Sequence, residues 1–213
     1  QVSGLGTPDL RGGYGSFTVF TDSNQLSDKV VSGGIIKKLD FEDKKAYSVL
    51  QGPRNSLRED SPHLHVPVIV ELDDTTTGAE VTVGDQTVSL REGEWSQWLT
   101  VEFEAIPIFV KISGIFKIYL KQAHPNVIVY LTPINIDPAR PVMPIFSSET
   151  VGEQLVTKIG PFFTQGLPED TKALSHGIFT DGEYLDHSYQ IIDERKKLLD
   201  YELARFAKLE QGF

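Results

Sequence analysis

The stretch Tyr130-Leu-Thr-Pro-Ile-Asn-Ile-Asp-Pro-Ala-Arg-Pro-Val-Met-Pro-Ile-Phe146 divides the chain into two kinds of sequence. Before it, most segments alternate apolar with polar residues and are rich in Val, Ile, Thr and Phe. After it, apolar residues recur every three or four positions, which is typical of amphipathic helices. The four prolines of the stretch exclude a helix there, because each removes an N–H donor and favours extended geometry in the preceding residue. We therefore predict an extended connector over residues 133–147, whose apolar side chains can pin it to a surface: Ile134, Ile136, Val142 and Ile145.

The part before the connector, residues 1–132, contains short segments typical of strands, separated by turn residues. They cover residues 16–22, 30–39, 46–50, 64–72, 79–83, 87–90, 98–104, 109–112, 116–120 and 127–131. Gly84 and Asp85 are typical of a tight hairpin, because glycine accepts a positive φ at the first turn position. Closely spaced strands without helices between them predict an antiparallel β-sandwich-like domain. The fold class is therefore mainly β, or α+β overall, with a C-terminal helical segment over residues 148–213.

The helical segment begins with two short helices. Ser148 is placed to cap the first helix, which carries Val151, Leu155 and Ile159 on one face and ends at Gly160. Residues 168–170, Pro-Glu-Asp, are expected to start the second helix, with proline in its first turn and two carboxylates near its positive end.

A long third helix is predicted from the capping box that Thr180 and Glu183 form, three positions apart. We expect it to run to about Leu209 and to end before Gly212. One stripe of this helix is apolar and comprises Leu185, Ile192, Leu199, Leu203 and Phe206. Such a stripe needs a partner surface. Either the β domain or a protein segment absent from this chain supplies it.

Composition narrows the function classes. The apolar share of 39% allows a core, and no segment approaches the ~20 apolar residues of a membrane span. The net charge of −10 argues against binding to a nucleic-acid backbone, which needs a positive surface. The absence of cysteine excludes disulfides and thiolate chemistry, but it does not decide the compartment. The start Gln1-Val-Ser, with neither Met nor basic residues, suggests a mature or excised segment without a secretory signal. Cytoplasmic and periplasmic locations both stay open.

His63 and His65 are the sharpest candidates for a metal site, because residues two apart on a strand point to the same face. Two ligands are too few for a closed zinc site, which usually has four, so edge or surface histidines are the simpler interpretation.

Two acidic groups invite a similar comparison. Residues 73–78, Asp-Asp-Thr-Thr-Thr-Gly, offer oxygens for calcium but lack the regular spacing of a dedicated loop, which favours a polar turn. The second group comprises Asp181, Glu183, Asp186 and His187. Its acids do not share one helix face, and acids in a first turn are expected from the helix dipole.

The glycine-rich residues 4–15 resemble a phosphate-binding loop only in composition. Such a loop needs a strand before it and a helix after it, whereas a strand is predicted over residues 16–22. We interpret residues 4–15 as a lead-in loop to that strand. No serine lies in a Gly-x-Ser-x-Gly context. Trp95 and Trp98 would form a sugar-stacking platform if exposed, although core packing is the commoner fate of tryptophan.

Several longer stretches are distinctive in combination. They are Gly6-Thr-Pro-Asp-Leu-Arg11, Leu90-Arg-Glu-Gly-Glu-Trp-Ser-Gln-Trp98, Tyr130-Leu-Thr-Pro-Ile-Asn-Ile-Asp137, Ile159-Gly-Pro-Phe-Phe-Thr-Gln-Gly-Leu-Pro-Glu-Asp-Thr-Lys-Ala-Leu174 and Asp193-Glu-Arg-Lys-Lys-Leu-Leu-Asp-Tyr201. Over essentially its whole length the chain resembles part of the bacterial type I phosphodiesterase/nucleotide pyrophosphatase proteins of the alkaline phosphatase superfamily.

The resemblance implies a fragment that lacks the catalytic core. Enzymes of that family use a Ser or Thr nucleophile and two divalent metals, commonly zinc, held by Asp and His of an α/β core. This chain has no Asp-x-x-x-His motif and no matching nucleophile motif. The resembling segment is a β-rich insertion between halves of the core. We therefore expect no catalysis and no cofactor in this chain alone, and two divalent metals in the complete enzyme.

The resemblance also gives a role to test. The chain would cap the active site of a metal-dependent phosphodiesterase or shape substrate access, with the catalytic core of the same polypeptide as its partner. Arg11, Arg54 and Lys172 are the cations that we would test first for reaching a phosphate-bearing substrate. The alternative is a standalone β-sandwich that binds another protein or a ligand, for example carbohydrate through Trp95 and Trp98. A complete small hydrolase has the least support, because no catalytic constellation is visible.

Overall fold

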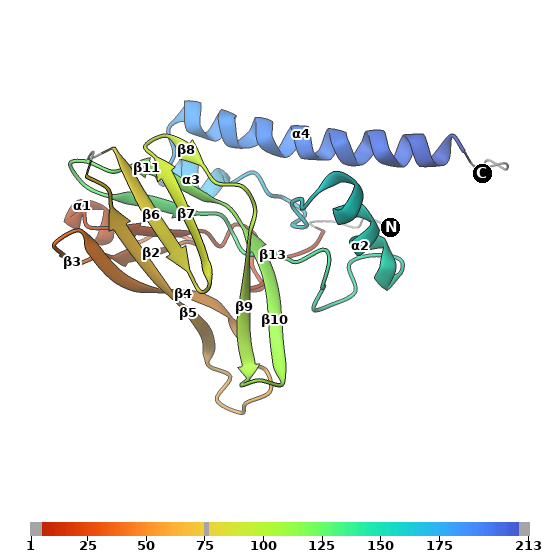
Figure 1. Ribbon diagram of the computed structural model, residues 1–213, viewed down its shortest axis with the longest axis horizontal. Coiled ribbons are helices and arrows are strands. Elements are labelled where there is room, and N and C mark those ends of the chain that lie inside the picture. Colours follow the sequence, from red (N-terminus) through yellow and green to blue (C-terminus); the bar gives the residue numbers. More distant parts are fainter. Residues whose placement is uncertain (1–5, 75–76, 209–213) are drawn as a thin grey trace.

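The chain changes from sheet to helix near the proline-rich stretch, as the sequence predicts (Figure 1). The structure is a computed structural model that describes residues 6–74 and 77–208. Its strands are β1 Thr18–Thr21, β2 Ile35–Lys38, β3 Phe41–Glu42, β4 Lys45–Arg54, β5 His63–Leu72, β6 Gly78–Val83, β7 Gln86–Arg91, β8 Glu94–Trp95, β9 Leu99–Ile106, β10 Val110–Phe116, β11 Ile118–Gln122, β12 Ile128–Leu131 and β13 Asn135–Ile136. Its helices are α1 Asn24–Ser27, α2 Glu149–Ile159, α3 Thr171–Ser175 and α4 Asp181–Phe206. The predicted class, mainly β with a C-terminal helical part, is confirmed.

Within the described residues, the strands form three sheets, with orders β2-β1-β12-β11-β8, β3-β4-β5-β6-β7 and β13-β10-β9. Paired strands run antiparallel except β1 and β2, which run parallel. Residues 22–34, which include α1, carry the chain back between these two strands, as parallel pairing requires. Ser23 caps α1, so a short helix lies between two predicted strands, where the sequence analysis expects no helix.

The sheet that contains β1, β11 and β12 is buried on both faces. Its side chains alternate, because successive residues of a strand point to opposite faces. Phe20 and Leu120 lie in the large core shared with the other sheets. Val19, Tyr119 and Tyr130 lie in a second core, under α3 and the start of α4. The helices therefore form a third layer on this sheet.

The β6–β7 hairpin and the connector follow local chemistry. Gly84 has φ +62°, the positive value predicted for the first position of this turn. In the connector, β13 pairs with β10, which buries Ile134 and Ile136, and Ile145 packs against the same core. Val142 is 51% exposed and does not pin the chain. The first half of the predicted connector therefore belongs to the sheets.

The helix starts differ from two expectations. Ser148 occupies the N-cap of α2, but its hydroxyl makes no capping hydrogen bond. The short helix α3 begins at Thr171, not at Pro168, because the Asp170 side chain accepts a hydrogen bond from the Ala173 N–H at 2.9 Å and so caps it. The Thr180–Glu183 capping box is present at the start of α4. Leu209 and Gly212, the predicted end of this helix, lie outside the described residues.

Candidate functional site

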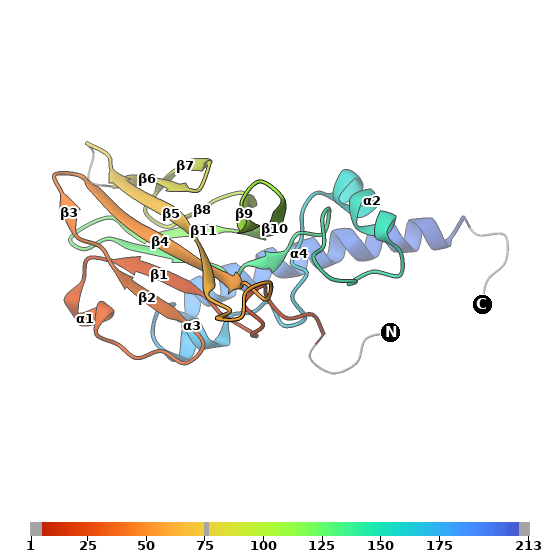
Figure 2. The same cartoon turned by 90° about the horizontal axis from the view of Figure 1, so that it is seen from below.

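Helix α4 crosses the β part, and its C-terminal half extends beyond the sheets (Figures 1 and 2). Its first turn is fixed through Glu183. This carboxylate accepts hydrogen bonds from the Thr180 N–H at 2.7 Å and the Tyr119 hydroxyl at 3.1 Å, and it pairs with Lys121. Burial works against ionisation of Glu183, but the hydrogen bonds from Lys121 and Thr180 lower its pKa. The start of α4 is therefore tied to β11.

A second tie is a nearly buried ion pair under the middle of the helix. The Lys117 Nζ lies 2.8 Å from the Glu194 Oε1, and the two side chains are 9% and 14% exposed. Glu194 also accepts hydrogen bonds from the Trp98 Nε1 at 3.0 Å and the Phe163 N–H at 3.2 Å. The ammonium lies 5.0 Å from the centroid of the Trp98 ring, a cation–π distance. All these groups are used within the molecule.

Between these ties, His187 of α4 is buried in an aromatic cluster. Its ring stacks on Trp95, with centroids 5.1 Å apart, and lies near Phe163 and Phe179. Desolvation lowers the pKa of His187 to about 4, with Lys117 adding to the effect, so the ring is neutral at pH 7. The Nε2 lies 3.2 Å from the Pro168 carbonyl oxygen, which makes Nε2 the protonated nitrogen. His187 is a core residue that holds α4 and the segment before α3.

The opposite side of α4 is exposed. Its side chains are 51–61% accessible and are named here the outer face: Leu185, Tyr189, Ile192, Leu199 and Leu203. Phe206 continues the same spacing and is 45% exposed. The sequence predicts that this stripe needs a partner, and the β part does not supply it for these five residues. Exposed apolar side chains gathered on one helix face are typical of an interaction site in soluble proteins.

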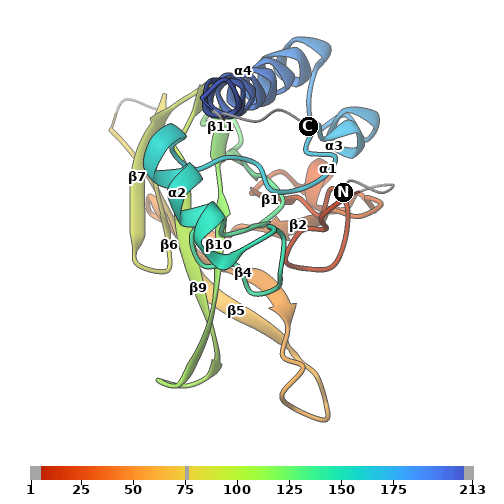
Figure 3. The same ribbon diagram turned by 90° about the vertical axis from the view of Figure 1, so that its right-hand side faces the viewer.

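A second exposed apolar feature is the β9–β10 hairpin tip. Ile108 and Phe109 are 85% and 84% exposed, and Ile108 has φ +71°, which a β-branched side chain rarely adopts. Asn55 of the β4–β5 loop donates to the Ala105 carbonyl at 2.7 Å, so this loop, with exposed Leu57, lies beside the tip. Figure 3 places the tip and α4 at opposite ends of the molecule.

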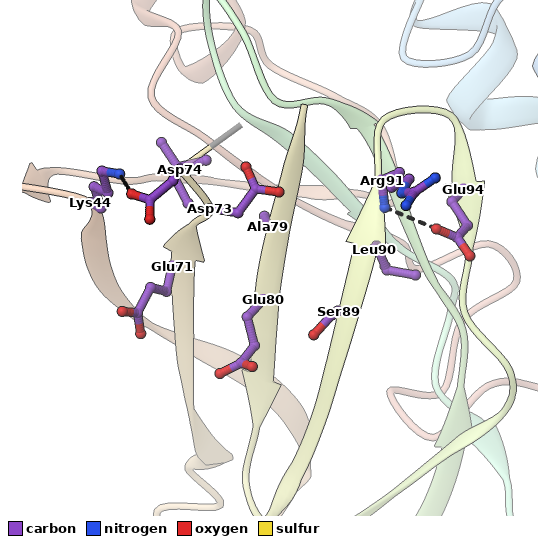
Figure 4. A pocket seen from close by; sticks show the side chains of 11 residues that line it. Lys44, Glu71, Asp73, Asp74, Ala79, Glu80, Ser89, Leu90, Arg91 and Glu94 are labelled. Carbon is purple, nitrogen blue, oxygen red and sulfur yellow. Dashed lines mark hydrogen bonds and ion pairs between the residues drawn. The ribbon is translucent and has the colours of Figure 1, made fainter. Parts of the chain in front are cut away.

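A hollow of about 590 Å³ lies on the β5–β7 face and at the β8 end (Figure 4). Glu71 and Glu80 are cross-strand neighbours there. Lys45 pairs with Glu71 at 2.7 Å, and this hydrogen bond raises the lysine pKa. Lys44 pairs with Asp74, which restrains the turn considered above for calcium. Thr75 and Thr76 of that turn lie outside the described residues. A solvated, partly neutralised polar face explains the hollow without a ligand.

The glycine-rich loop already holds an anion of its own. The buried Asp9 carboxylate accepts hydrogen bonds from the N–H groups of Arg11, Gly13 and Ser16, at 2.9, 3.1 and 3.2 Å. A phosphate-binding loop would keep such donors for its ligand. Strand β1 follows, in agreement with the interpretation as a lead-in loop.

The three cations proposed for substrate access have separate partners. The Arg11 Nη1 donates to the Thr18 hydroxyl at 3.3 Å, and burial lowers the pKa of this arginine despite nearby Asp9. The Arg54 Nη1 donates to the Ser61 carbonyl at 3.2 Å, in the β4–β5 loop. The Lys172 Nζ donates to the Tyr14 carbonyl at 2.7 Å, against the loop before β1. Their role in substrate access remains a prediction.

The histidine and tryptophan candidates also have partners in the fold. The His63 Nδ1 lies 3.0 Å from the Gly52 carbonyl, while His65 is an exposed residue of β5. Within residues 6–74 and 77–208, no group of three or more His, Cys, Asp or Glu could hold a metal. Trp95 stacks on Tyr119 at 4.7 Å, and Trp98 packs edge-on against Phe163 at 4.6 Å. Both indoles are partly buried and pack against aromatic side chains of the fold.

Comparisons with known proteins identify no relative. No model of a known protein family matches the sequence, and neither a curated protein nor a solved structure matches the chain. No described helix is long and apolar enough to cross a membrane. The outer face of α4 is therefore the candidate functional site on physical grounds alone.

Proposed function

We propose that the chain is a non-catalytic insertion or cap module of a metal-dependent phosphodiesterase or nucleotide pyrophosphatase. In this proposal the outer face of α4 docks on a catalytic core that this chain does not contain. The core supplies the nucleophile and two divalent metals, zinc in the commonest case. The β part shapes the access of substrate to that core, and Arg11, Arg54 and Lys172 are the cations to test for contact with its phosphate.

The single observation behind the docking role is the separation of two faces on α4. The inner face has specific polar and aromatic partners that fix the helix on the β part. The outer face has large apolar side chains in a row, which cost solubility and contribute little to the stability of this chain. A docking surface explains why such residues are present. The phosphodiesterase assignment rests on the resemblance of the sequence stretches alone.

The alternative is a standalone interaction module that uses the same face to bind another protein. Carbohydrate binding through Trp95 and Trp98 is the weaker form of the alternative, because both rings are packed against side chains of the fold. Titration of intrinsic fluorescence with mono- and oligosaccharides tests that form directly. A saturable shift of the indole emission would favour it over the docking role.

The decisive experiment compares this chain with the polypeptide of the complete reading frame. Hydrolysis of bis(p-nitrophenyl) phosphate is measured for both with added zinc or manganese. We expect activity in the longer protein only, and activity of the isolated chain would refute the non-catalytic assignment. If neither protein hydrolyses phosphodiesters under any metal, the phosphodiesterase proposal fails.

Variants then connect the site to the activity. Ile192→Lys and Leu199→Lys in the longer protein place charges in the docking surface and are expected to lower its activity or stability. Lys197→Glu, on an exposed neighbouring position, is the matched control. Joint replacement of Arg11, Arg54 and Lys172 by alanine tests substrate access, and an unchanged substrate preference would remove that role.

A further inference from the structure

The outer face of α4 has the spacing of a coiled-coil seam. Leu185, Tyr189, Ile192, Leu199 and Leu203, with Lys196 between the third and fourth, follow one another in alternating steps of four and three residues. An average step of 3.5 residues keeps a seam facing a second helix, whereas a general amphipathic surface follows a period of 3.6. From Leu185 to Leu203 the seam extends for roughly 27 Å at 1.5 Å per residue.

One border of the seam is uniformly acidic. Asp186, Asp193 and Asp200 each follow a seam residue and lie seven positions apart, so they form a straight column beside the seam. All three are exposed. Within the described part of the chain, none of them takes part in an ion pair. Positions of this kind set partner choice in coiled coils through charge pairing.

The charges argue against a second copy of this chain as the partner. In a parallel pair, Lys196 would meet Lys196 of the other copy inside the seam. In an antiparallel pair, the aspartate column of one copy would face that of the other, and like charges so placed are destabilising. Arg195 is the basic residue on the opposite border of the seam, and it already pairs with Glu169 at 2.8 Å. The charge pattern therefore requires a partner of different sequence.

We infer that the outer face of α4 is covered by an amphipathic helix of a different protein segment, with Lys or Arg at seven-residue intervals facing the aspartate column. An acidic or amide side chain of that helix lies opposite Lys196. This inference deepens the proposed function and rests on it, because it takes the covering helix to belong to the catalytic core. It specifies the kind of surface that the core must present.

The absence of cysteine from the sequence permits a direct test by single-cysteine labelling. Ile192→Cys and Leu199→Cys report on the seam, and Lys197→Cys and Ala204→Cys report on exposed positions off the seam. Each variant is made in this chain and in the longer polypeptide, and the rate of maleimide modification at α4 is read by mass spectrometry. We expect labelling in the longer polypeptide to slow at least about tenfold at the seam, with less than about twofold change off it.

A charge test accompanies the labelling. Asp193→Lys and Asp200→Lys, introduced together, are expected to restore fast labelling at Leu199→Cys in the longer polypeptide, because they repel a basic column. Glu202→Lys, on the other border of the seam, is the matched control and is expected to leave the protection in place. Sedimentation equilibrium of the isolated chain is expected to show a monomer.

Each other outcome overturns the inference. Equal protection of the off-seam positions would mean that a broad surface, and not a single helix, covers α4. Unchanged protection after the double charge reversal would show that the covering segment has no basic column opposite the aspartates. A dimer of the isolated chain with a protected seam would make a second copy the partner. Absence of protection in the longer polypeptide would show that no segment of it covers the seam. Labelling does not depend on hydrolysis, so an inactive but protected protein would refute the phosphodiesterase proposal and not this inference.

Discussion

Removal of one member of the Lys117–Glu194 pair is expected to detach α4 or to unfold the chain. Lys117 lies directly before β11, and its partner Glu194 lies in the middle of α4, 77 positions later in the sequence. Glu194→Ala deletes the ion pair and two further hydrogen bonds, those from Trp98 and Phe163. It leaves the buried ammonium with the Gln190 Oε1, 3.3 Å away, as its remaining polar partner among the described contacts.

The magnitude follows from burial. Because the two side chains are 9% and 14% exposed, the loss of one partner leaves a charge in a poorly solvated position. Breaking a buried pair in this way costs about 3–5 kcal/mol, well above the ~1 kcal/mol or less of an exposed pair. Lys117→Met is expected to cost about 2–4 kcal/mol, because Glu194 keeps the Trp98 and Phe163 donors. Each change consumes a large part of the stability of an ordinary domain, about 5–15 kcal/mol.

The double variant Lys117→Met/Glu194→Leu separates charge burial from packing. It removes both charges, so it leaves only the two N–H donors without an acceptor, at about 1–2 kcal/mol each. We therefore expect the double variant to be destabilised by less than the sum of the single variants, by about 2 kcal/mol or more.

Urea unfolding at pH 7, followed by intrinsic fluorescence, measures the free energy of unfolding of the unmodified chain, the two single variants and the double variant. Both tryptophans report on α4, since Trp98 donates to Glu194 and Trp95 stacks on His187. Lys111→Met, which removes the exposed partner of Glu102, is the matched control and is expected to cost less than about 1 kcal/mol. Strictly additive single changes, or single changes as small as that of the control, would refute the reasoning.

Three further predictions concern other parts of the molecule. Ile108→Gly is expected to raise the free energy of unfolding by about 0.5–1 kcal/mol, because glycine accepts φ +71° without strain and the lost side chain is largely exposed; urea unfolding that shows a loss would contradict this. The His187 pKa of about 4 lies below the unfolded value of 6.5, so the unfolded state binds the extra proton and stability falls as the pH drops from about 6.5 to about 4, by up to about 3 kcal/mol. His187→Phe should flatten the stability profile in that pH range, and an unchanged slope would assign it to other groups. Tyr130→Phe removes the 2.6 Å hydrogen bond to the buried Asp170 and is expected to cost about 1.5–3 kcal/mol in thermal or urea unfolding, since the carboxylate loses a donor.

Features set by local chemistry were predictable from the sequence. The prolines and the change of periodicity marked the passage from sheet to helix, which in the structure lies between β13, in the first half of the proline-rich stretch, and α2. The positive φ that glycine accepts was enough to predict the hairpin at Gly84. The spacing of Thr180 and Glu183, three positions apart, was enough to predict the start of α4. Ser148 shows the limit of such reasoning, because a residue in the N-cap position still has to orient its hydroxyl toward the helix.

Features set by distant pairing were not predictable. Lys117 interrupts an apolar stretch, and nothing near it in sequence indicates that Glu194 will neutralise it. The parallel pairing of β1 with β2 depends on α1, a single turn capped by Ser23 that no periodicity reveals. The apolar stripe of α4 was visible in sequence, but its exposure was not, because a second set of residues competes for the β part. That set comprises Tyr184, His187, Ile191, Glu194 and Leu198.

The competition between the two faces of α4 explains why the less apolar face is buried. The inner face carries groups with directional needs: Glu183 is hydrogen-bonded to Tyr119 of β11, Glu194 to Trp98 next to β9, and His187 to the Pro168 carbonyl in the segment before α3. Only one placement of the helix satisfies them together, so they fix its position although their net contribution to stability is small. The outer face has only apolar side chains and Lys196 along its seam, so it can pack on any matching surface. The polar groups of α4 bond within this chain and fix the orientation of the helix, while its heptad seam stays exposed. The helix is therefore suited to present that seam to a second protein surface.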